Sequence, residues 1–178
     1  MELTQAYLKE CFDYDPVTGN LIWKERPRSH FKTQRAYENN RRFVGRVAGA
    51  CDRYRLIHLG KLYGAHRLVW FWHFGRFPRG EIDHINRDSL DNRIENLREC
   101  TRTQNIWCMR SGRQGSRGVY PSSPGRWKAM IRIGGKKRHL GCFGSEKNAA
   151  LAYARAAVDH FGKFAPIEAK ELFEASYP

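Results

Sequence analysis

The sequence predicts an α+β fold built from two modules, and three observations support this prediction. Residues 81–105 follow the order strand, polar loop, strand and helix. Residues 117–144 hold three strand-forming segments, separated by Pro124-Gly125 and Gly134-Gly135, which are typical of hairpin turns. Residues 146–161 have the helical periodicity of an alanine-rich amphipathic helix, with an N-cap serine before it and a glycine after it. We therefore expect small antiparallel sheets with helices packed against them.

The elements expected before residue 76 mix helices and strands. In chain order they are a helix at 4–13, a strand at 21–24, strands at 43–47 and 54–59, and a buried helix at 64–74. The basic segment 25–42 lacks periodicity and is predicted to be a long loop. His66 and His73 lie on or near the last helix, where a histidine is more often a hydrogen-bonded packing residue than a ligand.

The charge distribution indicates a polyanionic partner. The chain has 32 Lys and Arg residues against 18 Asp and Glu residues, a net charge of +14 over 178 residues. Two basic blocks, residues 24–67 and 110–147, flank the nearly neutral segment 78–105. The blocks could be merely solvated faces, but their charges alternate with aromatic and strand-forming residues, which favours folded surfaces that bind a polyanion. An anionic membrane is a weaker candidate, because no basic amphipathic helix with a wide apolar face is evident.

The sequence also excludes several classes of protein. No apolar run approaches 18 residues, so no transmembrane helix is expected, and residues 1–12 lack the pattern of a secretory signal. The cysteines are odd in number, widely spaced and without a CxxC pair, which favours free thiols over disulfides or a zinc ribbon: Cys11, Cys51, Cys100, Cys108 and Cys142. We expect an intracellular, cytoplasmic protein.

Residues 81–105 carry side chains suited to phosphodiester hydrolysis. Asp83-His84 ends a short apolar strand, and Thr101-x-x-Gln104 is a capping box that places Asn105 in the first turn of a helix. Such a fold would bring Asp83, His84 and Asn105 to one end. A neutral imidazole with a pKa of about 6.5 can take a proton from water near pH 7. Carboxylate and amide oxygens suit Mg²⁺ or Mn²⁺. The alternative is that Asp83 and Asn105 are ordinary loop and cap residues.

At these positions the chain resembles the HNH endonucleases, specifically the branch of phage-encoded free-standing and intron homing endonucleases. The resemblance rests on Asp83-His84, on Asn96 twelve residues after His84, and on Asn105 nine residues further on. It implies a ββα-metal module in which Asp83 and Asn105 bind one divalent ion, Mg²⁺ or Mn²⁺. It also implies that His84 is the general base, that Asn96 steadies the loop and orients this histidine, and that the site meets the scissile phosphate from the minor groove.

The C-terminal third resembles the Apetala/ethylene-responsive-factor (AP2/ERF) DNA-binding domain. The matching segments are Gly118-Val119-Tyr120, Trp127-x-Ala129-x-Ile131, Leu140-Gly141-x-Phe143 and the helix that follows them. The resemblance implies that the three-stranded sheet enters the major groove while the helix packs behind it. The candidate DNA contacts lie on or beside the sheet: Arg117, Arg126, Trp127, Lys128, Arg132 and Arg138. Alternation places Lys128, Met130 and Arg132 on one face, and Trp127 could equally be a core residue.

Together these patterns predict a metal-dependent DNA endonuclease of the homing type, with residues 1–110 as the nuclease domain, 111–116 as a linker and 117–178 as the DNA-reading domain. Double-stranded DNA is the expected partner, and neither a membrane nor an obligate protein partner is expected. The alternative is a DNA-binding transcriptional regulator with a non-catalytic HNH-like module. The intact set Asp83, His84, Asn96 and Asn105 favours the enzyme. An RNA-binding protein would need more stacking aromatics on the sheet.

Overall fold

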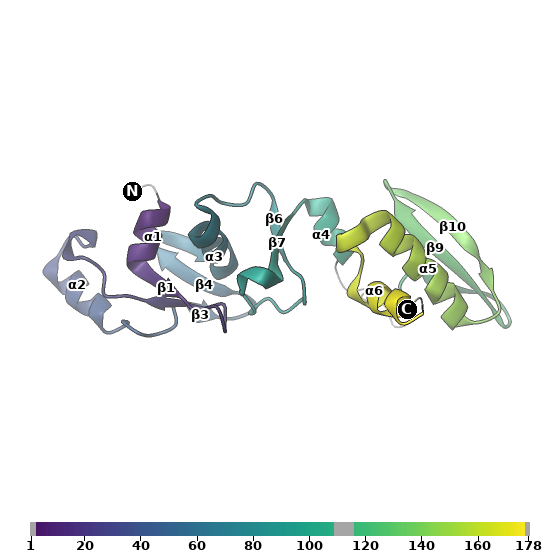
Figure 1. Cartoon of the computed structure of the whole chain (residues 1–178), viewed down its shortest axis with the longest axis horizontal. Coiled ribbons are helices and arrows are strands. Elements are labelled where there is room, and N and C mark those ends of the chain that lie inside the picture. The colour runs from purple at the N-terminus through teal and green to yellow at the C-terminus, as the bar shows by residue number, and fades with distance from the viewer. Residues whose placement is uncertain (1–2, 109–115, 177–178) are drawn as a thin grey trace. The chain divides into compact units, whose positions relative to one another are not determined.

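The computed structural model describes residues 3–108 and 116–176, and its contacts divide the chain into two units, Met1–Thr101 and Arg102–Pro178 (Figure 1). Each unit has its own hydrophobic core. The division falls nine residues before the domain boundary expected at residue 110. The expected linker, 111–116, lies outside the described residues except for Ser116. No helix in the described ranges is long and apolar enough to cross a membrane.

The first unit combines short helices with small antiparallel sheets, as expected for an α+β fold. The sheets pair β1 with β2, β3 with β4 and β5, and β6 with β7. Its elements in chain order are α1 (Gln5–Cys11), β1 (Phe12–Tyr14), β2 (Leu21–Trp23), the 3-10 helix η1 (Arg28–His30), α2 (Gln34–Arg41), β3 (Ala50–Cys51), β4 (Arg55–Leu59), β5 (Lys61–Gly64), α3 (Ala65–Phe74), β6 (Glu81–His84), the 3-10 helix η2 (Ile94–Asn96) and β7 (Leu97–Cys100).

Three segments of this unit differ from the sequence prediction. The helix expected at 4–13 ends at Cys11, and residues 12–14 form β1 instead. The expected loop 25–42 contains α2, which begins where the Thr33 hydroxyl accepts a hydrogen bond from the amide of Ala36. None of the residues of α2 is buried, so the helix has no apolar stripe from which it could be predicted. The expected strand 43–47 consists of turns instead. Val47 forms an isolated β-bridge with Ile22, and Gly45 and Arg46 share backbone hydrogen bonds with Trp23.

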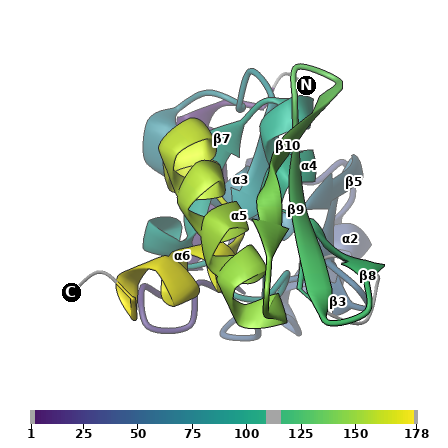
Figure 2. The same cartoon turned by 90° about the vertical axis from the view of Figure 1, so that its right-hand side faces the viewer.

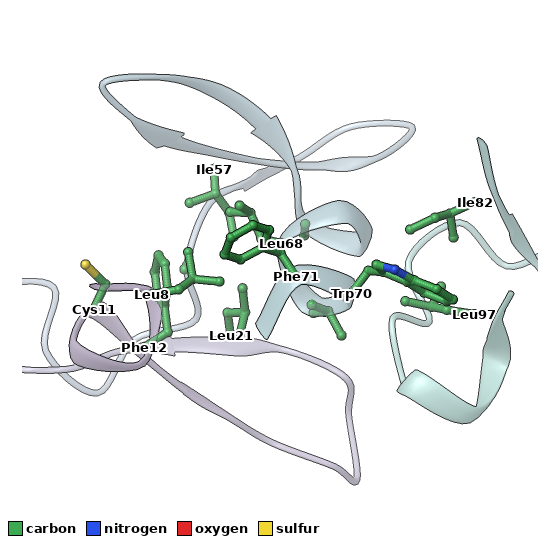
Figure 3. Close-up of a cluster of buried hydrophobic side chains, with 13 residues drawn as sticks. Leu8, Cys11, Phe12, Leu21, Ile57, Leu68, Trp70, Phe71, Ile82 and Leu97 are labelled. Carbon is green, nitrogen blue, oxygen red and sulfur yellow. The ribbon is translucent and has the colours of Figure 1, made fainter. Parts of the chain in front are cut away.

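The core of the first unit is centred on α3, which agrees with the buried helix predicted at 64–74. Leu68 and Phe71 meet Leu8 and Ile57 on one side, and Trp70 lies toward Ile82 and Leu97 of the β6–β7 hairpin (Figure 3). Burial of each such side chain contributes about 1.5–3 kcal/mol to stability. The packing of α3 thus holds the hairpin that carries the predicted site.

The second unit contains the three antiparallel strands and the helix that the sequence predicts. The sheet order is β10-β9-β8, and α5 lies across one face of β9 and β10 (Figure 2). Small side chains of α5, Ala154 and Ala157, are fully buried and let the helix approach the sheet closely. The elements are α4 (Arg102–Cys108), β8 (Val119–Ser123), β9 (Arg126–Ile133), β10 (Lys136–Phe143), α5 (Glu146–Phe161), the 3-10 helix η3 (Gly162–Phe164) and α6 (Ile167–Glu174).

The helix α4 explains why the division falls at Thr101. Trp107 of α4 stacks on Phe161 of α5, with ring centroids 4.4 Å apart, and the thiol of Cys108 donates to the carbonyl of Phe164 at 3.3 Å. These contacts belong to the core of the second unit. The capping box at Thr101 predicts that a helix begins there, but it does not show which core buries the helix.

The contrast between two glycines gives a test of this packing. We expect Gly118→Ala to destabilise the second unit severely, because Gly118 has φ +74° and a Cβ there would collide with the Tyr153 ring and the Met130 carbonyl. The expected loss combines about 1–2 kcal/mol for the left-handed backbone with a further 1–3 kcal/mol for overpacking. Gly125 has φ +69° but open space around it, so Gly125→Ala should show only the first of these losses. Urea unfolding curves of the two variants would decide, and equal losses would contradict the packing described.

Candidate functional site

The hairpin of β6 and β7 carries three of the four predicted active-site residues. His84 ends β6 and pairs with Leu97, and Asp83 pairs with Arg98. Asp83 and His84 are each only 8% exposed. Burying an ionisable group is unfavourable unless it is paired or hydrogen-bonded. The partners of these two side chains therefore define the site.

The loop between the two strands is closed by Asn96, the last residue of η2. Its Oδ1 accepts a hydrogen bond from the amide of Asn86 at 2.9 Å. Its Nδ2 donates to Oδ1 of Asn86 at 2.9 Å and to the carbonyl of Asp91 at 2.8 Å. One buried carboxamide thus joins the beginning, middle and end of the loop, and it fixes the backbone that follows His84.

The side chain that hydrogen-bonds to the His84 imidazole is Asn92, which no sequence pattern singles out. Nε2 of His84 lies 3.1 Å from Oδ1 of Asn92, while Nδ2 of Asn92 donates to the carbonyl of Leu90. Because Oδ1 can only accept, Nε2 carries the hydrogen, and in the neutral ring Nδ1 has the free lone pair. Asn96 steadies the loop as expected, but its side-chain hydrogen bonds go to the loop and not to the imidazole. A loop with several asparagines gives the sequence no means of telling which one reaches the ring.

Asp83 is held by a strong ion pair with Arg98. Nε and Nη2 of Arg98 lie 2.7 and 2.6 Å from Oδ2 of Asp83, and both side chains are largely buried. Charge-assisted hydrogen bonds of this kind are among the strongest in proteins. Both contacts use Oδ2. Carboxylate oxygens suit Mg²⁺ and Mn²⁺, although the positive charge of Arg98 opposes the binding of a second cation at this carboxylate.

Asn105, the second predicted metal ligand, lies in α4 and therefore in the second unit. The structure brings Asp83, His84 and Asn96 together in the first unit, and the grouping of Asn105 with them stays a prediction. Among the described residues, no three His, Cys, Asp or Glu side chains form a cluster that could hold a metal ion. The predicted metal ligands, Asp83 and Asn105, are one carboxylate and one carboxamide, so they would not form a cluster of that type.

His66, in the first turn of α3, lies beside the predicted general base. The ring centroids of His66 and His84 are 5.5 Å apart with the rings nearly perpendicular, and the ring of Tyr54 is 5.6 Å from His66. Burial, reinforced by the neighbouring charges of His84 and Arg67, lowers the pKa of His66 from 6.5 to about 4. His66 is therefore neutral at pH 7. From the sequence, His66 was expected to be a packing residue. A helical pattern does not show which other elements will pack against a given residue of the helix.

The turn between β1 and β2 supports the site loop from a distant part of the sequence. The hydroxyl of Tyr14 accepts a hydrogen bond from the amide of Ile94 at 2.9 Å. Gly19 is buried with φ +72°, and a Cβ there would collide with the backbone of Asn92 and Arg93. This position requires glycine, because any other side chain would push away the segment that holds Asn92 against His84.

The predicted DNA-contacting residues of the second unit lie on both faces of its sheet. Alternation along β9 places Arg126, Lys128 and Arg132 on the face opposite the buried Ala129 and Ile131. The outer face is hollowed, with a volume of about 270 Å³, and the residues that line the hollow are partly basic: Tyr120, Lys128, Met130, Ile131, Arg132 and Lys137.

The remaining three candidates lie elsewhere. Arg138 pairs with Ile131, so its register places it on the face that carries α5, although its side chain is exposed. Trp127 is half-buried on that same face, as a structural role requires. Arg117 precedes β8 and donates from Nη1 to the carbonyl of Trp107 at 2.9 Å. Alternation along β9 predicted the face of Lys128 and Arg132, whereas the face of Arg138 depends on the hairpin register that pairs it with Ile131.

One comparison with known proteins finds a match. Residues 63–106 match the family model described as HNH endonuclease, over 44 of the 178 residues. The matched segment runs from the end of β5 through α3 and the β6–β7 hairpin into α4, and it includes all four predicted active-site residues. No curated protein and no solved structure matches the chain significantly. The chain therefore carries an HNH endonuclease domain at 63–106, and this supports a nuclease at the level of the family.

The pKa of His66 leads to a prediction for stability. We expect the free energy of unfolding of the first unit to fall as the pH drops from about 6.5 to about 4. In this range the unfolded chain binds a proton at His66 and the folded chain does not, so the contribution is complete above pH 6.5 and is lost below it. The loss should be on the order of 3 kcal/mol. Urea unfolding at several pH values measures it. His66→Gln should flatten the dependence, while His58→Gln, at an exposed position of β4, should leave it unchanged.

Proposed function

We propose that this protein is a metal-dependent endonuclease that hydrolyses phosphodiester bonds in double-stranded DNA. The observation that carries the proposal is the His84 imidazole, which is buried in a segment that matches the HNH endonuclease model and is held through Nε2 by Asn92. This arrangement leaves Nδ1 of the neutral ring as the proton acceptor. A positioned histidine of this kind can take a proton from an attacking water near pH 7.

The other residues of the site have supporting roles in this proposal. Asn96 keeps the loop closed, and Asn92 keeps the His84 ring in one tautomer and one orientation. Asp83 and Asn105 would hold one divalent ion, Mg²⁺ or Mn²⁺. When bound, such an ion would neutralise the negative charge that develops on the phosphate and on the leaving oxygen. His66 lies against His84 and restricts how its ring can turn.

We further propose that the second unit binds DNA through the outer face of its sheet. Lys128 and Arg132 are on this face, and Lys137 pairs with Arg132 across the strands, so three cations lie along one hollow. This arrangement fits the AP2/ERF resemblance, in which a three-stranded sheet enters the major groove. A free-standing, phage-encoded homing enzyme is the context that the two resemblances together suggest.

A specific observation supports a second candidate function. The ion pair between Arg98 and Asp83 already neutralises the carboxylate that the metal would need. A protein in which this pair stays intact on DNA would bind DNA without cutting it, as a transcriptional regulator does. The two functions differ in one measurable property, which is Mg²⁺-dependent strand cleavage.

The decisive experiment is cleavage of supercoiled plasmid with Mg²⁺, with Mn²⁺ and with EDTA. We expect nicked or linear products with either metal and none with EDTA. His84→Ala should lower the cleavage rate by about 10²–10⁴-fold, because this is the usual contribution of a general base. Its affinity for DNA should stay within a few-fold of the wild type, since the base acts on water. His58→Ala is the matched control, at an exposed histidine of β4. Intact plasmid under every metal condition would favour the regulator, and equal rates for the His84 variant would exclude the proposed mechanism.

The role of the sheet can be tested by the salt dependence of DNA binding. If Arg132 contacts a phosphate, Arg132→Gln should reduce the slope of log affinity against log salt by about 0.9. If it reads a base edge, the loss should be about 1–3 kcal/mol at preferred sites and less elsewhere. Arg138→Gln is the matched control, because Arg138 occupies the opposite face of the same sheet. Equal effects of the two substitutions would show that the outer face is not the DNA-binding surface.

A further inference from the structure

The turn between α2 and β3 exposes three apolar side chains that are close together in the sequence. Phe43, Val44 and Val47 are 47%, 42% and 43% exposed, and all three lie within five residues of one another. Single exposed apolar residues are common on protein surfaces, but a compact group of them indicates a contact surface. We call residues 42–47 the apolar turn.

The apolar turn is surrounded by positive charge. Arg41, Arg42 and Arg46 are exposed, and the segment 39–49 contains no carboxylate. Glu25 reaches Arg41 from outside the segment, with the two charged groups 3.2 Å apart. A water-exposed apolar group flanked by arginines is complementary to a surface that offers both apolar faces and phosphates. Duplex DNA offers both, because its stacked bases lie between two rows of phosphates.

The backbone holds these side chains in fixed positions. Within the turn, the amide of Phe43 donates to the carbonyl of Asn40, and that of Arg46 donates to the carbonyl of Phe43. The turn is also tied to β2, because the amide of Gly45 donates to the carbonyl of Trp23 at 2.8 Å, and the amide of Trp23 donates to the carbonyl of Arg46 at 3.0 Å. The side chain of Phe43 is therefore presented outward from a braced backbone rather than from a free loop.

We propose that Phe43, together with Val44, inserts between base pairs of duplex DNA as an apolar wedge, while the flanking arginines contact phosphates. Proteins that insert apolar side chains in this way unstack one base step and kink the duplex by about 20–90°. Exposed apolar side chains on a rigid backbone and adjacent cations are the features that such a contact needs. This inference rests on the proposed function, because it takes DNA as the partner.

Insertion of a wedge unwinds DNA, and unwinding can be measured without knowing the target sequence. Closed circular plasmid is relaxed by a metal-independent type I topoisomerase in EDTA, with the protein bound, and the linking number is read from topoisomers after the protein is removed. We expect the wild-type protein to lower the linking number in proportion to the protein bound. Phe43→Ala should reduce the shift per bound molecule by about half or more, because alanine cannot span a base step.

Matched variants decide whether the shift comes from the wedge. Phe43→Leu keeps an apolar wedge and should retain most of the shift. Leu62→Ala removes an apolar side chain that is 60% exposed on β5 and should leave the shift unchanged. Thermal unfolding checks that each variant is folded.

The possible outcomes separate this inference from the proposed function. A protein that binds and cuts plasmid but produces no linking-number shift, or a shift that Phe43→Ala leaves unchanged, would overturn the wedge and leave the endonuclease standing. A protein that does not bind plasmid at all would overturn both. Sedimentation without DNA tests the alternative that a second copy of this chain covers the apolar turn. If Phe43→Ala dissociates an oligomer, the apolar turn is a contact between copies, and the wedge is excluded.

Discussion

The carboxamide of Asn96 makes three hydrogen bonds within the loop between β6 and β7, and the predicted site depends on these bonds. The loop follows His84 directly, so a shift of its backbone would move both the imidazole and the Asn92 side chain that holds it. Because Asn96 is only 6% exposed, water could not replace its partners without opening the hairpin. The burial of Asp83 beside Arg98 follows the same rule, since a buried charge is tolerated only when it is paired.

Support for the loop comes from outside the matched HNH segment. Residues 63–106 supply the hairpin and α3, but Tyr14 and Gly19 lie far upstream and still contact the loop at Ile94 and at the Asn92–Arg93 peptide. The N-terminal residues are therefore part of the structure that positions the site. The domain match alone would not reveal this, because the contacts are between turns whose sequences show only turn chemistry.

Much of the fold could be predicted from the sequence where a local pattern decides the structure. The helix α5 begins after Ser145 and ends before Gly162 as its capping residues indicate, and α3 and the three strands of the second unit are also where periodicity places them. The helix α2 could not be predicted, because a helix that buries nothing has no apolar period. Contacts between residues far apart in the sequence could not be predicted either. The pairing of Asp83 with Arg98 depends on the strand register, and the contact of His66 with His84 depends on how α3 packs.

The hydrogen bond between Tyr14 and Ile94 has a consequence for the order in which the chain folds. It spans 80 residues of sequence, and Gln5 bonds to the carbonyl of Trp72 across 67 residues, so the first unit must close long loops before its contacts can form. The strands of the second unit are joined by hairpins and followed at once by α5, which is a mostly local arrangement. Since loop closure slows folding and local contacts speed it, the second unit, which the ribosome makes after the first, should be the quicker one to fold. On this view the segment around His84 takes its final shape late, after its upstream supports have been brought back to it.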